Sequence, residues 1–402
     1  MKRTYLDHAA ATPVDSAVVG AMAPYWSETY GNPSSIHGEG VSAKRALGDA
    51  RKFIADALSV HADEVIFTGS ATESAHLAVT GTVRAWMRTH PNTRPHVVVS
   101  AIEHDAVLAS VRALASEIDI SYLPVDAEGI VSASELLPLL REETVLVSVM
   151  YANNEIGTVQ PLREIAATIR RWKKDVRHVT RDTKTAGDAY YPLLHTDACQ
   201  ATNYFRLTVP ELGVDLLTFN AAKIYGPKGI GALVLGRGVP LDAVVAGGGQ
   251  ESGRRGGTEN IPLIVGFARA LKIAEEIRVS EAERLLPIRD ELTQELSHMT
   301  CLTINGSLLH RLPNNVNFSV DNVDHEFLVL ALDAKGFAVS TKSACNEADA
   351  EHSHVLQALC DARGAGATSG IRVSLGRATT KADIDAFLVA LRDILGHMIV
   401  SL

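Results

Sequence analysis

Short apolar runs alternate with longer amphipathic stretches through the first two thirds of the chain. Six apolar runs predict strands at residues 64–70, 96–104, 144–155, 192–200, 214–223 and 231–236. Helical patterns fill three of the intervening stretches, at residues 71–89, 105–117 and 161–174. Continuous apolar runs of this length are typical of strands buried on both faces. Strands that alternate with helices predict an α/β fold with a largely parallel sheet and right-handed crossovers.

Polar clusters follow five of the six predicted strands. They occupy residues 70–74, 103–105, 153–155 and 197–200, and the fifth is Lys223. In an open α/β sheet, ligands bind beyond the carboxyl ends of the strands. We therefore expect the five clusters to meet around one crevice.

The pattern changes after about residue 262. A long helical pattern at 261–299 is followed by shorter runs that predict a second, smaller α/β region. We predict a large domain over residues 15–261. The small domain is predicted to combine residues 1–14 with residues 262–402.

Composition and charge narrow the class of protein. The chain has 402 residues, of which 46% are hydrophobic and 21% charged, as in a globular protein with a large core. Its net charge of −9 disfavours a general nucleic-acid or membrane-surface binder. Four cysteines without a CxxC pair disfavour a zinc cluster or a disulfide framework. Since the first residues also lack an apolar leader, these features predict a cytoplasmic protein without a metal site.

Lys223 stands at the end of an apolar run and before the glycine-rich stretch 226–231. A buried ammonium group is costly unless it is paired, neutral or used covalently. A desolvated lysine can form a Schiff base with a carbonyl cofactor, whereas the alternative is an ordinary surface lysine. Asp197 lies 26 residues earlier, at another strand end. Its carboxylate can keep a pyridinium nitrogen protonated, as pyridoxal phosphate requires, or it can cap a helix.

Three further clusters each have a cofactor-binding and a structural interpretation. The turn at residues 69–74 can bind a phosphate at a helix N-terminus, or it can form an ordinary capping box. His104 can stack on a cofactor ring and transfer protons, or it can be structural. Asn154 can donate a hydrogen bond to cofactor or substrate, or it can stabilise a turn.

Two more candidates lie in the predicted small domain. Cys345 belongs to a polar, small-residue stretch, which makes its thiol a candidate nucleophile. Arg372 lies in a strand-like alternation and can bind a substrate carboxylate with two hydrogen bonds. The alternative for Arg372 is a salt bridge at the rim of the fold.

Ten motifs resemble, in order, those of the cysteine desulfurases: YLDHAAATPVD, GNPSSIHGEG, FTGSATES, IEHDAVL, NNEIGTVQP, HTDACQA, KIYGPKGIGAL, GGGQESGRRGGTEN, SACN and IRVSLGRATT. The similarity spans essentially the whole chain. The stretch around Cys345 resembles the housekeeping iron–sulfur-assembly and nitrogen-fixation desulfurases. The resemblance implies a fold-type I pyridoxal-phosphate enzyme whose large domain holds a mostly parallel seven-stranded sheet.

The resemblance also implies an activity and a set of site residues. L-cysteine would be converted to L-alanine, and the sulfur would pass to Cys345 as a persulfide for iron–sulfur cluster or thio-cofactor assembly. The implied cofactor contacts are Lys223, Asp197, His104, Gln200 and Asn154 at the ring, and Ala71, Thr72, Asn220 and Thr258 at the phosphate. Among these, Lys223 forms the Schiff base, Asp197 pairs with the ring nitrogen, and His104 stacks on the ring and transfers protons.

Substrate and partner contacts follow from the same resemblance. Arg372 would bind the substrate carboxylate, with Asn32 and Asn154 assisting at the substrate. Thr258 would reach the phosphate in the neighbouring subunit, which implies a homodimer. A sulfur-acceptor or iron–sulfur scaffold protein is the expected further partner.

The sequence departs from the family in two places. The tripeptide before the lysine is usually Ser-Gly-His or similar, and here it is Asn220-Ala221-Ala222. Ala222 cannot donate a side-chain hydrogen bond, a loss that would weaken cofactor binding by about 1 kcal/mol. The stretch 175–194 is longer than usual and predicts a surface loop or hairpin. Cys199 is interpreted as a packing residue.

Two other functions are compatible with these motifs. One is a selenocysteine lyase or a related pyridoxal-phosphate transferase, such as an aminotransferase. An aminotransferase does not need the thiol of Cys345, so this residue favours desulfuration. The other is a catalytically weakened dimeric partner protein, supported only by the departures at Asn220 and Ala222.

Overall fold

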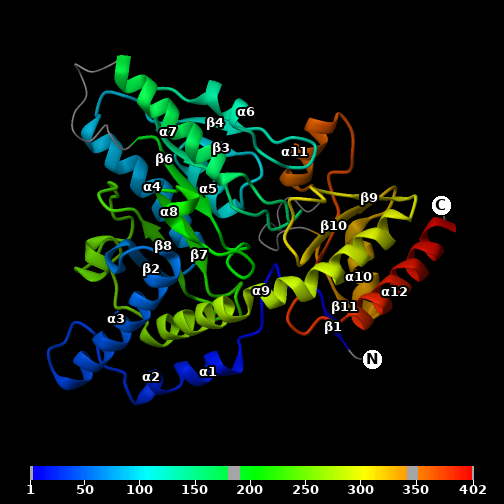
Figure 1. The fold of residues 1–402 in the computed structure, drawn as a ribbon, viewed down its shortest axis with the longest axis horizontal. Coiled ribbons are helices and arrows are strands. Elements are labelled where there is room, and N and C mark those ends of the chain that lie inside the picture. The colour runs from blue at the N-terminus through cyan, green and yellow to red at the C-terminus, as the bar shows by residue number, and fades with distance from the viewer. Residues whose placement is uncertain (1–2, 180–190, 342–351, 401–402) are drawn as a thin grey trace.

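A seven-stranded sheet forms the centre of the protein (Figure 1). The structure is a computed structural model that describes residues 3–179, 191–341 and 352–400. In spatial order the strands are β2 (Val65–Thr68), β8 (Gly231–Leu235), β7 (Leu216–Asn220), β6 (Leu193–Asp197), β5 (Thr144–Ser148), β3 (His96–Ser100) and β4 (Asp119–Leu123). All neighbouring pairs are parallel except the two made by β8. The predicted α/β fold with a mostly parallel seven-stranded sheet is confirmed.

The six predicted apolar runs form six of these strands. The seventh strand, β4, was not predicted. It lies at the edge of the sheet, and its sequence DISYL is mostly half-buried or exposed. Because an edge strand buries less of its surface, it does not need the continuous apolar run that marks the central strands.

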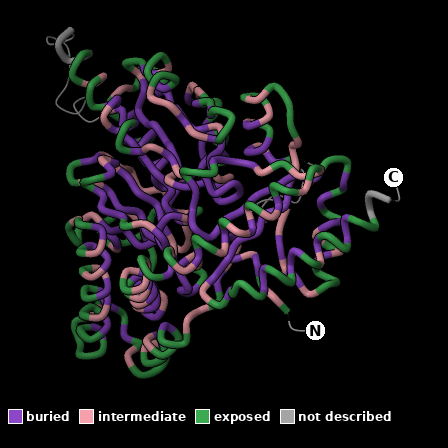
Figure 2. Tube along the Cα trace, turned by 45° about the vertical axis from the view of Figure 1, so that its right-hand side comes forward, coloured by how far each residue is buried: buried purple, intermediate pink, exposed green. Residues whose placement is uncertain are grey.

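Helices cover both faces of the sheet, and alternate strand residues point to opposite faces. Val97 and Val99 of β3 pack in the same cluster as α4 (Ala71–Thr89) and α5 (Asp105–Ala113). Val98 faces the opposite layer. That layer contains α3 (Gly38–Leu58), α7 (Leu162–Val179) and the first half of α9 (Ile261–Ser297). Figure 2 shows the strands buried between helices whose outer surfaces are exposed.

A smaller sheet follows the long helix α9. Its three antiparallel strands are ordered β12 (Ile371–Ser374), β10 (Asn315–Val320) and β9 (Leu302–Ile304). Helices α10 (His325–Ala334), α11 (His354–Arg363) and α12 (Lys381–Val400) belong to the same region. The short elements elsewhere are α1 (Ser16–Met22), α2 (Pro24–Ser27), α6 (Ala133–Leu136), α8 (Val209–Leu212), and the 3₁₀ turns η1 (Ala62–Glu64), η2 (Leu137–Leu139) and η3 (Gln250–Gly253).

The N-terminal residues pack with this C-terminal region. Strand β1 (Thr4–Tyr5) pairs in parallel with β11 (Phe337–Ala338), and Asp7 bridges to Ser374. Figure 1 accordingly shows both chain ends on the same side of the molecule. The pairing supports the grouping of residues 1–14 with the small domain. The division into two domains stays a prediction, and the predicted loop at 175–194 lies largely outside the described residues.

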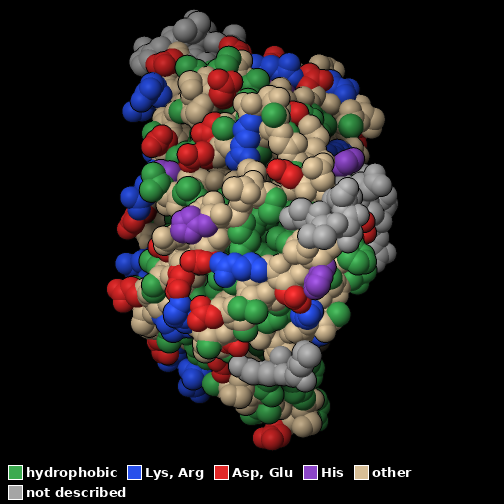
Figure 3. Space-filling view, turned by 90° about the vertical axis from the view of Figure 1, so that its right-hand side faces the viewer, with side chains coloured by type: hydrophobic (Ala, Val, Ile, Leu, Met, Phe, Trp, Pro, Cys, Tyr) green, Lys and Arg blue, Asp and Glu red, His purple; other side chains and the backbone are tan. Residues whose placement is uncertain are grey.

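Surface features add two observations. In the part of the chain that the structure describes, none of the helices is long and apolar enough to cross a membrane. Acidic and basic side chains are interspersed over the face shown in Figure 3.

Candidate active site

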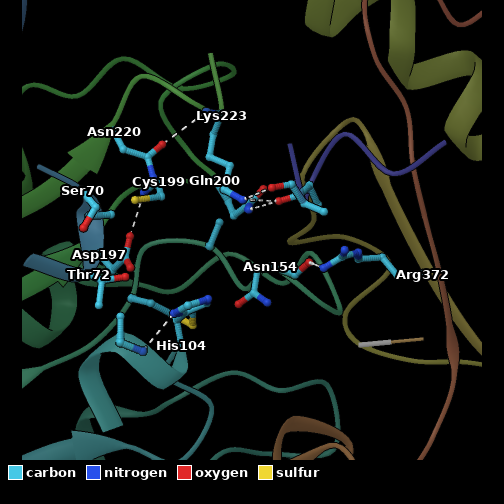
Figure 4. Close-up of a pocket in the computed structure, with 16 residues that line it drawn as sticks. Ser70, Thr72, His104, Asn154, Asp197, Cys199, Gln200, Asn220, Lys223 and Arg372 are labelled. Atoms are coloured by element: carbon cyan, nitrogen blue, oxygen red, sulfur yellow. Dashed lines mark hydrogen bonds between the residues drawn. The ribbon is translucent and has the colours of Figure 1, made fainter. Parts of the chain in front are cut away.

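A cavity of about 200 Å³ lies at the carboxyl ends of the strands (Figure 4). All five predicted polar clusters contribute to it. Its lining includes Ser70, Ala71, Thr72, His104, Asn154, Asp197, Cys199, Gln200, Asn220, Lys223 and Arg372. Ala9 and Ala10 of the N-terminal segment complete the lining on another side. The expectation that these clusters meet around one crevice is confirmed.

Lys223 follows strand β7 and extends toward the N-terminal segment. Its Nζ donates to the carbonyl oxygens of Ala9 and Ala10, at 2.8 and 2.5 Å. Its backbone N–H donates to Asn220 Oδ1 at 3.2 Å, which fixes the turn after the strand. A Cβ on Gly226 would lie 2.7 Å from the Ala221 side chain, so glycine is required for this tight turn. The ammonium group is thus held by backbone acceptors from a distant part of the chain.

Asp197 ends strand β6 and is 94% buried. Its Oδ1 accepts a hydrogen bond from the Cys199 backbone N–H at 2.9 Å. Burial, together with the charge of Asp197, raises the pKa of the Cys199 thiol well above its usual value. Cys199 therefore stays a neutral thiol, which supports its interpretation as a packing residue.

Glu103 is a buried carboxyl group whose importance the sequence did not reveal. Burial raises its pKa to about 8, and the negative charge of Asp197 adds to the effect. Glu103 Oε1 accepts a hydrogen bond from the Met150 backbone N–H, while Oε2 has no partner among the described residues. Glu103 is therefore a neutral acid at pH 7 that joins the ends of β3 and β5. The sequence signal was only its place in the polar cluster 103–105.

The N-terminus of α4 faces the cavity. Ser70 caps this helix, and its Oγ accepts from the Glu73 backbone N–H at 3.1 Å. Ala71 and Thr72 line the cavity in the first turn of the helix, where backbone N–H groups favour an anion. The carboxylate of Glu73 is paired with Arg255 at 2.7 Å. This arrangement suits a phosphate group.

Two other cavity side chains are held by hydrogen bonds, and a third residue is held through its backbone. His104 caps α5, and its Nδ1 accepts from the Ala106 N–H at 3.0 Å, so the proton of the neutral ring lies on Nε2. Gln200 Nε2 donates to the Ala9 carbonyl at 3.0 Å. Asn154 is buried beside the cavity, and its backbone carbonyl accepts from Arg372.

Arg372 on β12 is only 1% exposed. Its Nη2 pairs with Asp7 Oδ1 at 2.7 Å, and its Nη1 donates to the Asn154 carbonyl at 3.1 Å. Nε has no partner within the described chain. The pair with Asp7 neutralises the buried guanidinium and orients it toward the cavity (Figure 4).

Two of the predicted site residues that the structure describes are not brought to this cavity. Asn32 is exposed, and its Oδ1 accepts from the Ser34 N–H. Thr258 lines a separate cavity with Arg255. Cys345 lies outside the described residues. The roles of all three stay predictions.

The departure from the family before Lys223 is also visible. Asn220 lines the cavity, but Ala222 is not among the lining residues. The Ala222 carbonyl instead accepts from the Thr12 hydroxyl at 2.9 Å.

Within the described ranges, no group of three His, Cys, Asp or Glu side chains is arranged to hold a metal ion.

Comparison with known proteins gives matches along nearly the whole chain. Residues 4–387 match the aminotransferase class-V family. The chain is 40% identical over 398 residues to the cysteine desulfurase IscS of Dictyoglomus turgidum, which covers 98% of this chain and 95% of that protein. The cysteine desulfurase IscS of Methanosarcina thermophila is 40% identical over 395 residues, or 98% and 92% of the two chains.

Solved structures agree with the sequence matches. A structure described as a NifS-like protein has a TM-score of 0.85 at 34% identity, and the match covers 98% of this chain and all of that one. A structure of SspA in complex with cysteine has a TM-score of 0.74 at 31% identity, and the match covers 92% and 98% of the two chains.

Proposed function

The chain belongs to the aminotransferase class-V family and, within it, to the pyridoxal-phosphate-dependent cysteine desulfurases, and we propose that it converts L-cysteine to L-alanine with the sulfur passing to Cys345. The observation that carries the reaction is the convergence of Lys223, Asp197 and Arg372 on one buried cavity. The proposed role of Cys345 rests on its match to the SACN motif of the family.

The residues of the cavity fit pyridoxal phosphate. Asp197 is a buried carboxylate suited to a protonated ring nitrogen, and the start of α4 at Ala71 and Thr72 is suited to the phosphate. His104, Gln200, Asn154 and Asn220 would surround the ring and its substituents. When bound, the cofactor withdraws electrons from the substrate Cα.

Three side chains of the protein would bind the substrate and move its protons. Arg372 would bind the substrate carboxylate through the guanidinium N–H groups that its bonds to Asp7 and to the Asn154 carbonyl leave free. Lys223 Nζ, held near Ala9 and Ala10, would take the proton from Cα and return a proton to the alanine product. His104, whose Nε2 carries the hydrogen of the neutral ring, would lie against the cofactor ring and donate a hydrogen bond to the substrate sulfur.

Sulfur transfer balances without an added oxidant. The Cys345 thiolate attacks the substrate sulfur, so an S–S bond forms while the C–S bond breaks. The electron pair of the C–S bond stays on the carbon fragment, which is protonated and released as alanine. Cys345 then carries a persulfide, which must be passed to a sulfur-acceptor or iron–sulfur scaffold protein.

We also propose that the enzyme is a homodimer in the cytoplasm. Three large apolar side chains are exposed on α2 and on the segment before α3, with Trp26 at 59%, Tyr30 at 71% and Ile36 at 97%. Large apolar side chains exposed within one short stretch of chain suit contact with a partner subunit. Thr258 and Asn32, which lie away from this chain's cavity, would act across that interface. Cys199, Cys301 and Cys360 are free thiols, as is usual in a reducing compartment.

The test uses the purified protein with pyridoxal phosphate, L-cysteine and a thiol reductant. Alanine and sulfide are quantified for the wild type and for Cys345→Ala. We expect alanine formation to collapse in Cys345→Ala while the absorbance band of the bound cofactor persists. A wild-type protein that binds the cofactor but forms no alanine would refute the proposal and favour the weakened partner protein.

A further inference from the structure

The start of α11 is attached to the two loops that carry His104 and Asn154. Ser353 caps α11, with its Oγ accepting from the Leu356 N–H at 3.2 Å. The same hydroxyl donates to Glu155 Oε2 at 2.6 Å. Both residues are buried, at 4% and 2% exposure, so this hydrogen bond to a carboxylate is shielded from water.

His354 makes a second attachment one residue later. Its Nε2 lies 2.8 Å from the Glu103 carbonyl oxygen. Since a carbonyl can only accept, Nε2 must carry the hydrogen. Glu103 directly precedes His104, and Glu155 directly follows Asn154. The two contacts therefore end at the immediate neighbours of two cavity residues.

The acceptors are themselves rigidly held. The Glu155 carbonyl accepts from the side-chain amides of Asn315 and Asn317, at 3.2 and 3.3 Å. The Glu155 N–H donates to Asn153 Oδ1 at 2.8 Å. Glu103 is fixed through the Met150 N–H. A helix start docked on such groups has little freedom to shift relative to the cavity.

A third contact lies on the other side of Cys345 in the sequence. Ser340 forms a two-way backbone bridge with Arg372, at 2.6 and 3.2 Å. Cys345 lies five positions after Ser340 and eight positions before Ser353. Chain geometry therefore keeps the Cys345 Cα within about 18 Å of Ser340 and within about 29 Å of Ser353. The attachments at Ser340, Ser353 and His354 thus set the space that the thiol can reach.

We propose that Ser353 and His354 are positioning residues for sulfur transfer, which they support by fixing the start of α11 on Glu155 and Glu103. The inference rests on the proposed function, because it assigns Cys345 the role of nucleophile. Loss of either attachment widens the space available to the thiol without altering any residue that lines the cavity. Sulfur transfer should slow, while chemistry that needs only the cavity residues should continue.

The experiment compares two rates in the full-length holoenzyme. The first is single-turnover formation of alanine from L-cysteine, which needs the thiol. The second is exchange of the Cα hydrogen of L-alanine with deuterated solvent, which needs the cofactor and the cavity residues. We expect Ser353→Ala to slow alanine formation at least tenfold and to change the exchange rate less than twofold. Ser353→Thr retains a hydroxyl and should restore alanine formation to within threefold of wild type.

Ser132→Ala is the matched control. Ser132 caps α6 with a 3.2 Å bond to the Glu135 N–H, the same distance as in the cap of α11, but it has no contact with the cavity loops among the bonds of the described chain. It should leave both rates unchanged. If Ser353→Ala does not fold, as judged by thermal unfolding, His354→Leu removes the second attachment and is tested in the same way.

The outcomes separate this inference from the proposed function. Alanine formation at the wild-type rate in Ser353→Ala and His354→Leu would overturn the positioning role alone. An equal loss of both rates would also overturn it, because the residues would then support the whole cavity. A wild-type holoenzyme that exchanges the Cα hydrogen but forms no alanine would refute the proposed function, and the inference with it.

Discussion

The cavity has two walls that are built differently. The strand-end wall consists of residues 70–72, 104, 154, 197, 199, 200, 220 and 223, at the carboxyl ends of the large sheet. The docked wall consists of Ala9, Ala10 and Arg372, and Asp7 supports it through its ion pair with Arg372. On the strand-end wall, Asp197 and His104 are each fixed by a backbone N–H two residues away. On the docked wall, Arg372 is held by partners 365 and 218 residues away.

This difference determines what each wall depends on. The strand-end wall is set by the sheet and by short turns, so it forms wherever the sheet forms. The docked wall exists only when strand β12 and the N-terminal segment are packed against the region of the large sheet. Lys223 joins the two, because it is anchored on β7 while its Nζ contacts the Ala9 and Ala10 carbonyls. Substitutions on the two walls should therefore fail in different ways.

The largest effect is expected at this junction. Lys223→Ala removes the group that we propose binds the cofactor covalently and moves the Cα proton. Alanine formation should fall by at least about 10³-fold, and the absorbance band of the lysine-linked cofactor should disappear. Lys228→Ala is the control, because Lys228 is an exposed lysine five residues later in the same turn region. Alanine formation above a tenth of the wild-type rate in Lys223→Ala would contradict the assigned role.

Asp7→Ala should damage the docked wall alone. It leaves the buried Arg372 guanidinium without its carboxylate partner. Removal of one partner of a buried pair costs about 3 kcal/mol of unfolding free energy. We also expect the KM for L-cysteine to rise at least tenfold while the cofactor band stays, since the strand-end wall is untouched. Chemical denaturation and steady-state kinetics measure the two effects.

The exposed ion pair of Arg3 with Asp333 supplies the control for Asp7→Ala. Both side chains are about half exposed, so Asp333→Ala should cost less than about 1 kcal/mol and leave the KM unchanged. If the cofactor band were lost in Asp7→Ala, the two walls would not be independent.

The same contrast explains what the sequence could predict. Apolar runs and the polar residues that follow them are local signals, so the large sheet and residues such as Asp197 and Lys223 were predicted correctly as members of one crevice. The Ala9 and Ala10 carbonyls were missed because a backbone acceptor has no sequence signature. The partnership of Arg372 with Asp7 was missed because it depends on how distant segments pack.

Glu103 shows a further limit of sequence analysis. It stands in a predicted polar cluster, but the sequence does not reveal that its side chain is completely buried next to Asp197. Burial makes it a neutral acid, whereas an exposed glutamate at the same position would be charged. The strand-end wall is therefore predictable in its members but not in their protonation.

A pH series on Glu103→Gln tests this protonation. The pKa of Glu103 is raised from the ordinary 4.5 to about 8, so between these values the folded protein keeps a proton that the unfolded chain has lost. Stability from this group is complete below about pH 4.5 and is lost as the pH rises through about 8. Between pH 6.5 and 7.5, wild type should lose about 1 kcal/mol of unfolding free energy relative to Glu103→Gln. Parallel stability curves for the two proteins would show that Glu103 is ionised in the folded state.

The smallest effect is expected for Cys199, the strand-end cysteine that lines the cavity. Its thiol is held neutral by burial and by Asp197, and the contact that fixes Asp197 uses its backbone N–H, which Cys199→Ala retains. We therefore expect a stability loss of about 1 kcal/mol and alanine formation within threefold of wild type. Cys345→Ala, assayed alongside, should abolish alanine formation. If Cys199→Ala abolished it instead, the nucleophile would belong to the strand-end wall, and sulfur transfer would not require the thiol of Cys345.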